Sequence, residues 1–332
     1  MVRTKREAPR DAGGAGAGKR LNGGSDRIAL VLDIDNTLVH SAPDTALPMS
    51  EFQGNHMDDV RRFQVPPEVN TGGVPLNYHV KLRHGLAEFL EHTHERFDLA
   101  VYTHGSAGYM KKILEIIDPK RVYFGDRLVS RTEGEQIKRL ALLFPNRRPS
   151  IIIDDRDDVW EEEARSSVML VRPFHFFRSR VEVAVPPLMR SGGRSAEDYV
   201  RLDPQADTQL QSIQSALDRV LDCWRALPPT APVHEAVTRM RQGVLQGVCM
   251  VFAGGLIIDH GAAAQHPLWR HAEALGARCH MVMSDAVTHV ISGKSESGTV
   301  RHAQQHGLFA LSPDWLLECV FQCRRMPEQD FA

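Results

Sequence analysis

The segment "LVLDIDNTLVHS", from Leu30 to Ser41, restricts the possible folds of this chain more than any other. Its apolar start predicts a buried strand, yet two carboxylates, Asp33 and Asp35, follow directly. In an open α/β sheet such charges belong at the carboxyl end of a strand, because that is where ligands bind. The segment therefore predicts a sheet strand with a polar site at its end.

Strands and helices alternate from Arg27 to about Phe177. Further buried strands are predicted at "DLAVYTHGS" and "PSIIIDDRDD", and a fourth strand at "SVMLVRPF". Helical spacing predicts helices at "HGLAEFLEHTHERF", "AGYMKKILEIIDP" and "IKRLALLFP". This alternation predicts an α/β fold, a Rossmann-like parallel sheet with helices on both faces.

The remaining sequence divides into three parts. Residues 1–26 contain mainly glycine, alanine and charged residues, and we expect them to be disordered. Residues 178–242 are predicted to be a linker with one amphipathic helix, for which Asp207 is the expected N-cap. Residues 243–332 alternate again and predict a second, small α/β domain after the first one at 27–177.

Composition excludes several classes of protein. A net charge of −2 gives no general field for nucleic acid or for a membrane surface. The five cysteines form no CxxC pair, so neither a zinc site nor a disulfide framework is predicted. Cys319 and Arg325 have the C-x5-R spacing of a thiol phosphatase, but the segment lacks glycine and continues a helical pattern. Since no apolar stretch suits a membrane span or a secretory signal, we expect an intracellular, reducing compartment.

Polar residues end three of the predicted strands. Asp33 and Asp35 are two residues apart and share one side of an extended strand, Thr103 ends the second strand, and Asp154 and Asp155 end the third. In a parallel sheet these ends lie on one edge, so the four carboxylates converge. A divalent cation would offset their repulsion, and hard oxygen ligands favour Mg²⁺.

Phosphoryl transfer additionally requires cations that hold the oxygens of the phosphate. Lys138, Arg131 and Arg83 lie on predicted loops or helix starts beside these strands. Thr37, in the turn after the first strand, is placed to fix that turn by bonding to the backbone.

The segment "VLDIDNT" resembles the DxDxT motif of the haloacid dehalogenase superfamily of aspartyl phosphatases. Over residues 27–177, "VKLRHGLAEFL", "AVYTHGSAGY", "YFGDRLVSR", "IIIDDRDDVW" and "FHFF" resemble one branch, the TFIIF-associated phosphatases of the RNA polymerase II C-terminal domain. The glycine turn "GGLI" and Trp315 in "SPDWLLECV" resemble a BRCT domain, and this family combines both units.

The resemblance implies a Mg²⁺-dependent protein serine/threonine phosphatase in the nucleus, acting on the phosphorylated C-terminal heptad repeats of the largest subunit of RNA polymerase II. It implies that Asp33 attacks phosphorus and becomes an aspartyl-phosphate, that Asp35 is the general acid and base, and that Lys138 clamps phosphate and nucleophile. The implied metal ligands are the Asp33 carboxylate, the Asp35 backbone carbonyl and Asp155, with Asp154 close to them. The implied phosphate- and substrate-binding residues are Thr37, Arg83, Thr103 and Arg131.

The chain departs from the family pattern at several positions. His84 replaces a proline and His104 a methionine. In the BRCT-like part, Ala253 occupies the position of a phosphate-binding hydroxyl and no lysine accompanies Arg301, so we expect docking of a protein, such as a transcription factor, rather than phosphate binding.

The insert at 41–78 suits a flap but not a cap domain, which leaves room for a protein tail as substrate. Two other functions stay open at this point: a DNA-end phosphatase in repair, and a scaffold that binds phosphopeptides without turnover. The absence of Lys/Arg runs argues against the first, and the complete set of acids against the second.

Overall fold

The computed structural model describes residues 27–48, 59–67, 73–131, 134–178, 185–195, 206–257 and 259–332. The predicted disordered tail at 1–26 lies outside the described residues, as do parts of the predicted flap and linker. Among the described helices, none is both long and apolar enough to cross a membrane.

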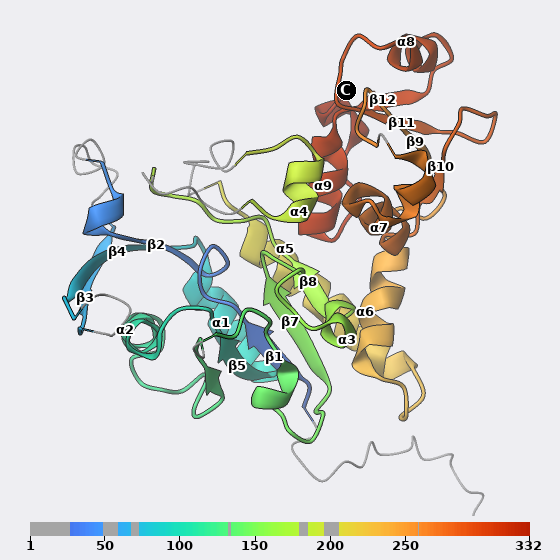
Figure 1. Ribbon diagram of the computed structural model, residues 1–332. Helices are drawn as coiled ribbons and strands as arrows, with labels where there is room; N and C mark the ends of the chain where they lie inside the picture. Colours follow the sequence, from blue (N-terminus) through green and yellow to red (C-terminus); the bar gives the residue numbers. More distant parts are fainter. Residues whose placement is uncertain are drawn as a thin grey trace, which may run out of the picture.

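A five-stranded parallel sheet forms the centre of the first half of the chain (Figure 1). Its strand order is β6-β5-β1-β7-β8. The strands are β1 (Ala29–Leu32), β5 (Asp98–Tyr102), β6 (Leu128–Val129), β7 (Ser150–Asp154) and β8 (Val168–Leu170). The predicted α/β class and the four predicted strands are confirmed.

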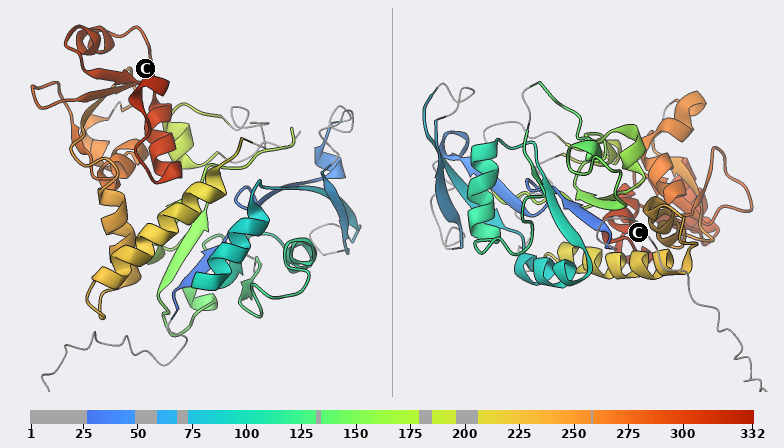
Figure 2. Two further views of the ribbon diagram at one scale, coloured as in Figure 1. Left: turned by 180° about the vertical axis from the view of Figure 1, so that it is seen from behind. Right: turned by 90° about the horizontal axis from the view of Figure 1, so that it is seen from below.

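Side chains alternate between the two faces of β1 and enter two different apolar clusters. Leu30 and Leu32 pack in the first cluster, with helices α1 (Leu86–Arg96), α2 (Ala107–Ile117), α5 (Gln209–Ala226) and α6 (Val233–Gln242). Figure 2 shows α1 and α5 side by side over this face of the sheet. The amphipathic helix predicted in the linker thus covers the sheet, with Leu210, Ile213, Leu217 and Leu221 buried.

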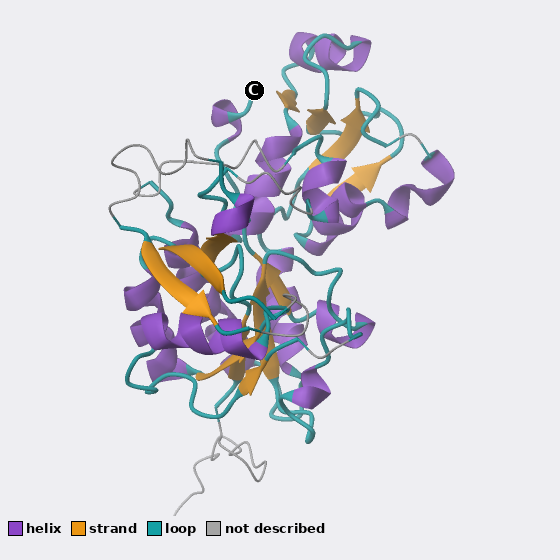
Figure 3. Cartoon of the chain, turned by 60° about the vertical axis from the view of Figure 1, so that its left-hand side comes forward, coloured by secondary structure: helices purple, strands orange, loops and turns teal. Residues whose placement is uncertain are grey.

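The insert between Asp35 and Arg83 contains a second, antiparallel sheet, which we call the flap sheet (Figure 3). Its strands are β2 (Val39–Pro43), β4 (Leu76–Leu82) and β3 (Arg61–Val65), in the order β2-β4-β3. The short 3-10 turn Asp44–Ala46 follows β2.

The helix predicted at "IKRLALLFP" is wrong, because the structure has only the 3-10 turn Leu140–Leu142 there. The cause is a tertiary contact of the backbone at Lys138. Its N–H donates to Val159 O at 2.7 Å, and its carbonyl accepts from Glu161 N at 3.1 Å. These bonds hold the chain extended beside Trp160, where an α-helix cannot form.

Three helices were not predicted: α3 (Glu162–Arg165), α4 (Pro187–Ser191) and α6. At the start of α5 the N-cap residue is Thr208 rather than Asp207, although Asp207 Oδ1 still accepts a bond from Gln209 N at 2.9 Å.

The C-terminal part contains a four-stranded parallel sheet in the order β10-β9-β11-β12. Its strands are β9 (Cys249–Ala253), β10 (Arg278–His280), β11 (His289–Ser292) and β12 (Phe309–Leu311). Its helices are α7 (Pro267–Ala274), α8 (Gly298–Gln305) and α9 (Pro313–Gln322), with 3-10 turns at His260–Gln265 and Glu328–Asp330. This is the small α/β unit that the sequence predicts.

The second apolar cluster extends from the central sheet into the C-terminal part. It contains Ala29 and Val31 of β1, Leu188 of α4, and Trp315 and Leu316 of α9, all of which are buried. The two α/β units therefore share a continuous apolar interior. The predicted domain boundaries stay predictions.

Candidate active site

A turn directly after β1 places the residues of the DxDxT motif. Ile34 O accepts bonds from the N–H groups of Leu38 and Val39 at 2.9 and 3.1 Å, and Asn36 has a positive φ of 60°. Asparagine tolerates this left-handed conformation better than most residues. Ile34 is fully buried, so Asp33 and Asp35 are left to the opposite side, as the alternation predicts. We call this segment the 34–39 turn.

Lys138 lies between two of the acids. Its Nζ is 2.6 Å from Asp33 Oδ1 and 2.7 Å from Asp154 Oδ2, and only 2% of the residue is exposed. Burial alone would lower the pKa of this amine, but Asp154 and Asp33 outweigh that effect and raise it. Trp160 Nε1 donates to the same Asp154 oxygen at 2.8 Å. Lys138 is therefore a fixed cation beside the proposed nucleophile.

Asp33, Asp154 and Asp155 form a carboxylate cluster with oxygen atoms within 4.8 Å of one another. Burial, together with neighbouring acids, raises the pKa of Asp33 to about 7 and raises that of Asp155 well above its usual value. Buried acids this close repel one another, and a divalent cation relieves that repulsion. Since Asp154 already accepts bonds from Lys138, Trp160 and the N–H of Arg156, Asp33 and Asp155 are the better ligands. The donor set fits a hard divalent cation.

Asp35 is held by neutral hydroxyl groups instead of a cation. Tyr109 OH donates to its Oδ1 at 2.5 Å and Ser41 Oγ at 3.3 Å, while Thr103 Oγ1 donates to Oδ2 at 3.3 Å. Burial raises the pKa of Asp35, and these hydroxyl groups offset only part of the effect. A carboxyl group with a raised pKa beside a nucleophile is suited to donate a proton. Tyr109 and Ser41 were not predicted as site residues.

Thr37 and Arg83 support the 34–39 turn. The Thr37 hydroxyl is buried and accepts a bond from Asp155 N at 3.1 Å, the backbone contact that the sequence predicts for it. The Arg83 side chain is also buried, and it donates to Thr37 O at 3.1 Å and to Asp207 Oδ2 at 2.8 Å. Two of its nitrogens are thus engaged with the protein, which differs from the substrate contact expected for it.

Arg131 and His104 lie at the entrance to this site. Arg131 is exposed, and its backbone N–H donates to Gly105 O at 3.0 Å, which places it beside the loop after β5. Burial lowers the pKa of the half-buried His104, and Lys138, Arg156 and Arg131 add to this effect. Both positions belong to the rim of the site rather than to the carboxylate cluster.

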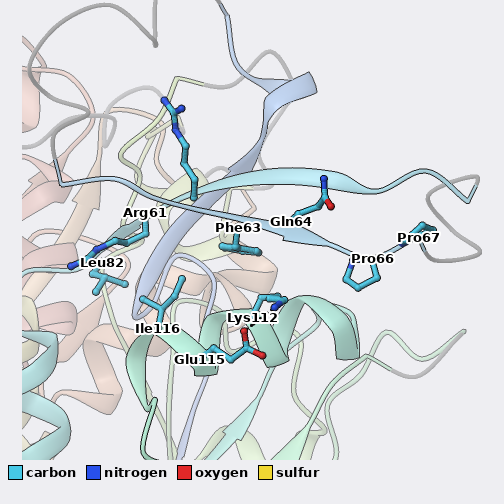
Figure 4. Close-up of a pocket in the computed structure, with 10 residues that line it drawn as sticks. Arg61, Phe63, Gln64, Pro66, Pro67, Leu82, Lys112, Glu115 and Ile116 are labelled. Atoms are coloured by element: carbon cyan, nitrogen blue, oxygen red, sulfur yellow. Dashed lines mark hydrogen bonds and ion pairs between the residues drawn. The ribbon is translucent and has the colours of Figure 1, made fainter.

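A groove of 880 Å³ lies between the flap sheet and α2 (Figure 4). Phe63 points from β3 toward α2, and its ring is 5.9 Å from that of Tyr109, the residue that contacts Asp35. Phe63, which lines the groove, thus lies beside the tyrosine that bonds to Asp35, the proposed general acid. It is lined by Arg61, Arg62, Phe63, Gln64, Pro66, Pro67, Leu82, Lys112, Glu115 and Ile116.

Two segments of the chain match known protein families. Residues 28–184 match the family described as "NLI interacting factor-like phosphatase", and residues 259–315 match the family described as "twin BRCT domain". The first match contains every residue of the site described above except Asp207.

Individual relatives extend the similarity over most of the chain. RNA polymerase II C-terminal domain phosphatase-like 4 of Arabidopsis thaliana is 25% identical over 92% of this chain and 70% of its own length. An RNA polymerase II C-terminal domain phosphatase of Caenorhabditis elegans is also 25% identical over 92% of this chain, which spans only 45% of that protein. A solved structure of the fission yeast RNA polymerase II CTD phosphatase Fcp1, a point variant bound to beryllium fluoride, superimposes with a TM-score of 0.70 at 26% identity, over 92% of this chain and 95% of that one.

Proposed function

Because residues 28–184 match the family described as "NLI interacting factor-like phosphatase", we propose that this chain is a Mg²⁺-dependent protein serine/threonine phosphatase acting on the C-terminal heptad repeats of RNA polymerase II. The names of its relatives support this substrate. The observation that carries the proposal is the pairing of two different acids: Asp33 against the cation of Lys138, and Asp35 within a set of hydroxyl groups.

In the first half of the proposed reaction, an oxygen of Asp33 attacks phosphorus. The bond from phosphorus to the serine oxygen breaks while a bond to Asp33 forms, which gives an aspartyl-phosphate. Asp35, whose pKa is raised by burial, acts here in its protonated form and gives its proton to the departing serine oxygen. A serine alkoxide is a poor leaving group, so this proton transfer lowers the barrier.

In the second half, Asp35 is a carboxylate and takes a proton from a water molecule. The water oxygen attacks phosphorus and the bond to Asp33 breaks, so inorganic phosphate leaves and both acids return to their first states. Lys138 Nζ lies 2.6 Å from Asp33 Oδ1, where it compensates the charge of that carboxylate before the attack and after the release of phosphate.

The Asp33 and Asp155 carboxylates would hold Mg²⁺, together with the Asp35 carbonyl and with Asp154 nearby. When bound, the ion offsets the repulsion between an anionic nucleophile and an anionic phosphate, an effect worth several kcal/mol. The chain itself contributes the position of the ligands: Thr37 and Trp160 fix Asp155 and Asp154 by hydrogen bonds.

A protein tail suits the surroundings of this site. The described part of the insert is a three-stranded flap sheet rather than a separate cap domain. The adjoining groove offers aromatic and proline side chains and the cations of Arg61 and Arg62, while Lys112 is paired with Glu115; these features match a proline-containing phosphorylated peptide. We place the enzyme in the nucleus with this substrate, and we assign the BRCT-like part a docking role toward a protein partner such as a transcription factor.

Asp33→Asn tests the proposal, because the amide has the shape of the carboxylate but is not nucleophilic. Turnover of a phosphoserine heptad peptide should fall at least about 1,000-fold, since covalent catalysis depends on this one group. Asp59→Asn is the matched control, because the Asp59 side chain is 85% exposed and, among the described residues, pairs with Lys81 on the flap sheet. EDTA should inactivate the wild-type enzyme and Mg²⁺ should restore it.

The same assay separates the two open alternatives. A DNA-end phosphatase would turn over a phosphorylated DNA end faster than the peptide, and a scaffold would bind the peptide without releasing phosphate. Normal turnover by Asp33→Asn, or full activity in EDTA, would contradict the proposed mechanism.

A further inference from the structure

We propose that Asp207 is a positioning residue for this reaction, acting through Arg83 on the 34–39 turn. Asp207 lies far from the DxDxT motif in sequence, outside the segment that matches the phosphatase family. Nothing in its neighbourhood resembles a catalytic motif. The inference rests on the proposed phosphatase activity and adds a residue to the machinery that supports it.

Asp207 accepts hydrogen bonds from two groups in the interior of the protein. Its Oδ2 accepts from Arg83 Nε at 2.8 Å, and its Oδ1 accepts from the N–H of Gln209 at the start of α5 at 2.9 Å. The side chains of Arg83 and Asp207 are only 1% and 9% exposed. An ion pair this well buried loses most of its screening by solvent, and a cation left there alone is strongly destabilising.

Arg83 also donates hydrogen bonds to the 34–39 turn, so it connects Asp207 to that turn. Its Nη1 donates to Thr37 O at 3.1 Å, and its backbone N–H donates to Leu38 O at 3.0 Å. The hydroxyl of the same threonine accepts from Asp155 N at 3.1 Å. Thr37 is therefore fixed at its carbonyl by Arg83 and at its side chain by Asp155, between the motif acids and the proposed metal ligand.

Contacts with the C-terminal part of the chain hold the start of α5, and with it Asp207, in position. Gln209 is fully buried; its Oε1 accepts from Arg172 N at 3.2 Å and its Nε2 donates to Phe321 O of α9 at 2.6 Å. Arg172 also forms an ion pair with Glu318 of α9. The start of α5 is thus attached to α9, so the contact from Asp207 to the 34–39 turn begins at the BRCT-like part.

The variant Asp207→Ser, made in the full chain, distinguishes between the two contacts of Asp207: the bond to the start of α5 and the ion pair with Arg83. Serine can still accept the Gln209 N–H at a helix start, but it is too short to reach Arg83. With p-nitrophenyl phosphate as substrate, we expect kcat per folded molecule to fall about tenfold with a smaller change in KM, and the Mg²⁺ concentration for half-activation to rise several-fold. A tenfold change corresponds to about 1.4 kcal/mol.

Two further variants complete the design. Asp207→Glu keeps the charge and should recover part of the lost kcat and of the Mg²⁺ response. Asp222→Asn is the control on the same helix. The Asp222 side chain is 76% exposed and, within the described part of the chain, pairs with Arg225, so this variant should match wild type in kcat and in Mg²⁺ response. If the serine variant does not fold, Asp207→Asn tests the charge instead, because it removes the ion pair with Arg83 and its one amide oxygen can accept only one of the two bonds.

The outcomes are distinct. Wild-type kcat and Mg²⁺ response in folded Asp207→Ser would overturn the inference, and so would a loss explained entirely by a smaller folded fraction. An inactive wild-type enzyme in the same assay would instead overturn the proposed function.

Discussion

Asp33 and Asp35 are two residues apart, yet the groups that bond to them differ in charge. Their proposed roles depend on this difference. Asp33 has a counter-charge, Lys138 Nζ at 2.6 Å, whereas Asp35 receives only neutral hydroxyl groups from Tyr109, Ser41 and Thr103. Asp33 is buried and Asp35 is partly buried, and burial raises the pKa of each carboxyl group. Two neighbouring acids in different environments are the usual basis for a division between nucleophile and proton donor.

Tyr109→Phe tests the proposed division between nucleophile and proton donor by removing one hydroxyl group that bonds to Asp35. Without the 2.5 Å bond to Asp35, the acid is less well oriented toward the leaving group. We expect kcat to fall about tenfold for phosphoserine peptide, in line with the net contribution of about 0.5–1.5 kcal/mol of an ordinary hydrogen bond. The effect on p-nitrophenyl phosphate should be smaller, since that leaving group needs no proton. Equal losses on both substrates would contradict the assigned role of Asp35, and Tyr123→Phe serves as control because its ring packs against His94 instead.

The sequence was enough to name the acids and the lysine of the candidate site, but not most of the residues that hydrogen-bond to them. Strand alternation was enough to bring Asp33, Asp35, Asp154 and Asp155 to one sheet edge, and the family resemblance added Lys138. Tyr109, Ser41, Trp160 and Asp207 were missed, because a hydroxyl, indole or carboxylate that orients another side chain shows no sequence pattern of its own. Arg83 was predicted to face the substrate, and the geometry places two of its nitrogens on Thr37 and Asp207.

At the level of elements, β2 and the segment 173–177 are joined by one histidine. His40 Nδ1 accepts from the N–H groups of Phe176 and Phe177 at 2.7 and 2.9 Å, so its ring must be neutral at that nitrogen. Burial, with a smaller effect of His175, lowers the pKa of His40 to about 3, and burial with a smaller effect of Arg83 lowers that of His175 to about 4. The flap sheet is thereby attached to the segment beyond β8 by groups that bind protons only after unfolding.

Stability should therefore depend on pH in a defined window. The unfolded histidines bind protons near pH 6.5 but the folded ones do not, so stability is complete above that value and declines as the pH falls toward 4. Each ring should contribute a slope of about 1.4 kcal/mol per pH unit. His40→Asn keeps an acceptor and does not titrate, so urea unfolding between pH 7.5 and 5 should show a shallower slope by about that amount. An unchanged slope would contradict the assignment, and the exposed His234→Asn is the control.

Strands and helices were predicted correctly where the local sequence pattern and the tertiary contacts favour the same structure. The four predicted strands of the central sheet were found, because continuous apolar runs are typical of strands covered on both faces. The helix expected at "IKRLALLFP" was wrong because Lys138 bonds by its backbone to the segment after β7, a contact between residues far apart in sequence. The flap sheet has polar and proline residues whose local pattern is typical of irregular structure, and it forms because its three strands pair with one another and its apolar residues pack on the core.

At the level of the whole molecule, the two α/β units meet at a close backbone approach between α6 and α7. Gly276 follows α7 with φ of 94°, and a Cβ atom placed there would lie 2.0 Å from Gln242 O at the end of α6. Leu245 N donates to Leu275 O at 2.7 Å in the same joint. Only glycine suits both the conformation and the distance.

Gly276→Ala should destabilise the entire chain. Gly255→Ala is the matched control, because Gly255 has a similar φ of 81° with no atom within 4 Å of the added Cβ. The control should lower the free energy of unfolding by about 1–2 kcal/mol from conformational strain alone, and Gly276→Ala should lower it by clearly more. Because the apolar interior is continuous, phosphatase activity and tryptophan fluorescence should be lost in one transition. Equal effects of the two variants, or separate transitions, would contradict this view of the joint.

The place of α5 in the chain has a consequence for synthesis on the ribosome. This helix begins at Gln209, yet it covers the face of the sheet whose first strand was made about 180 residues earlier. Translation delivers residues in order, so a nascent chain that already contains every motif acid still lacks the buried face of α5 that completes this apolar cluster. We therefore expect such a chain to expose part of the cluster to solvent and to become active only after the later helices have left the exit tunnel.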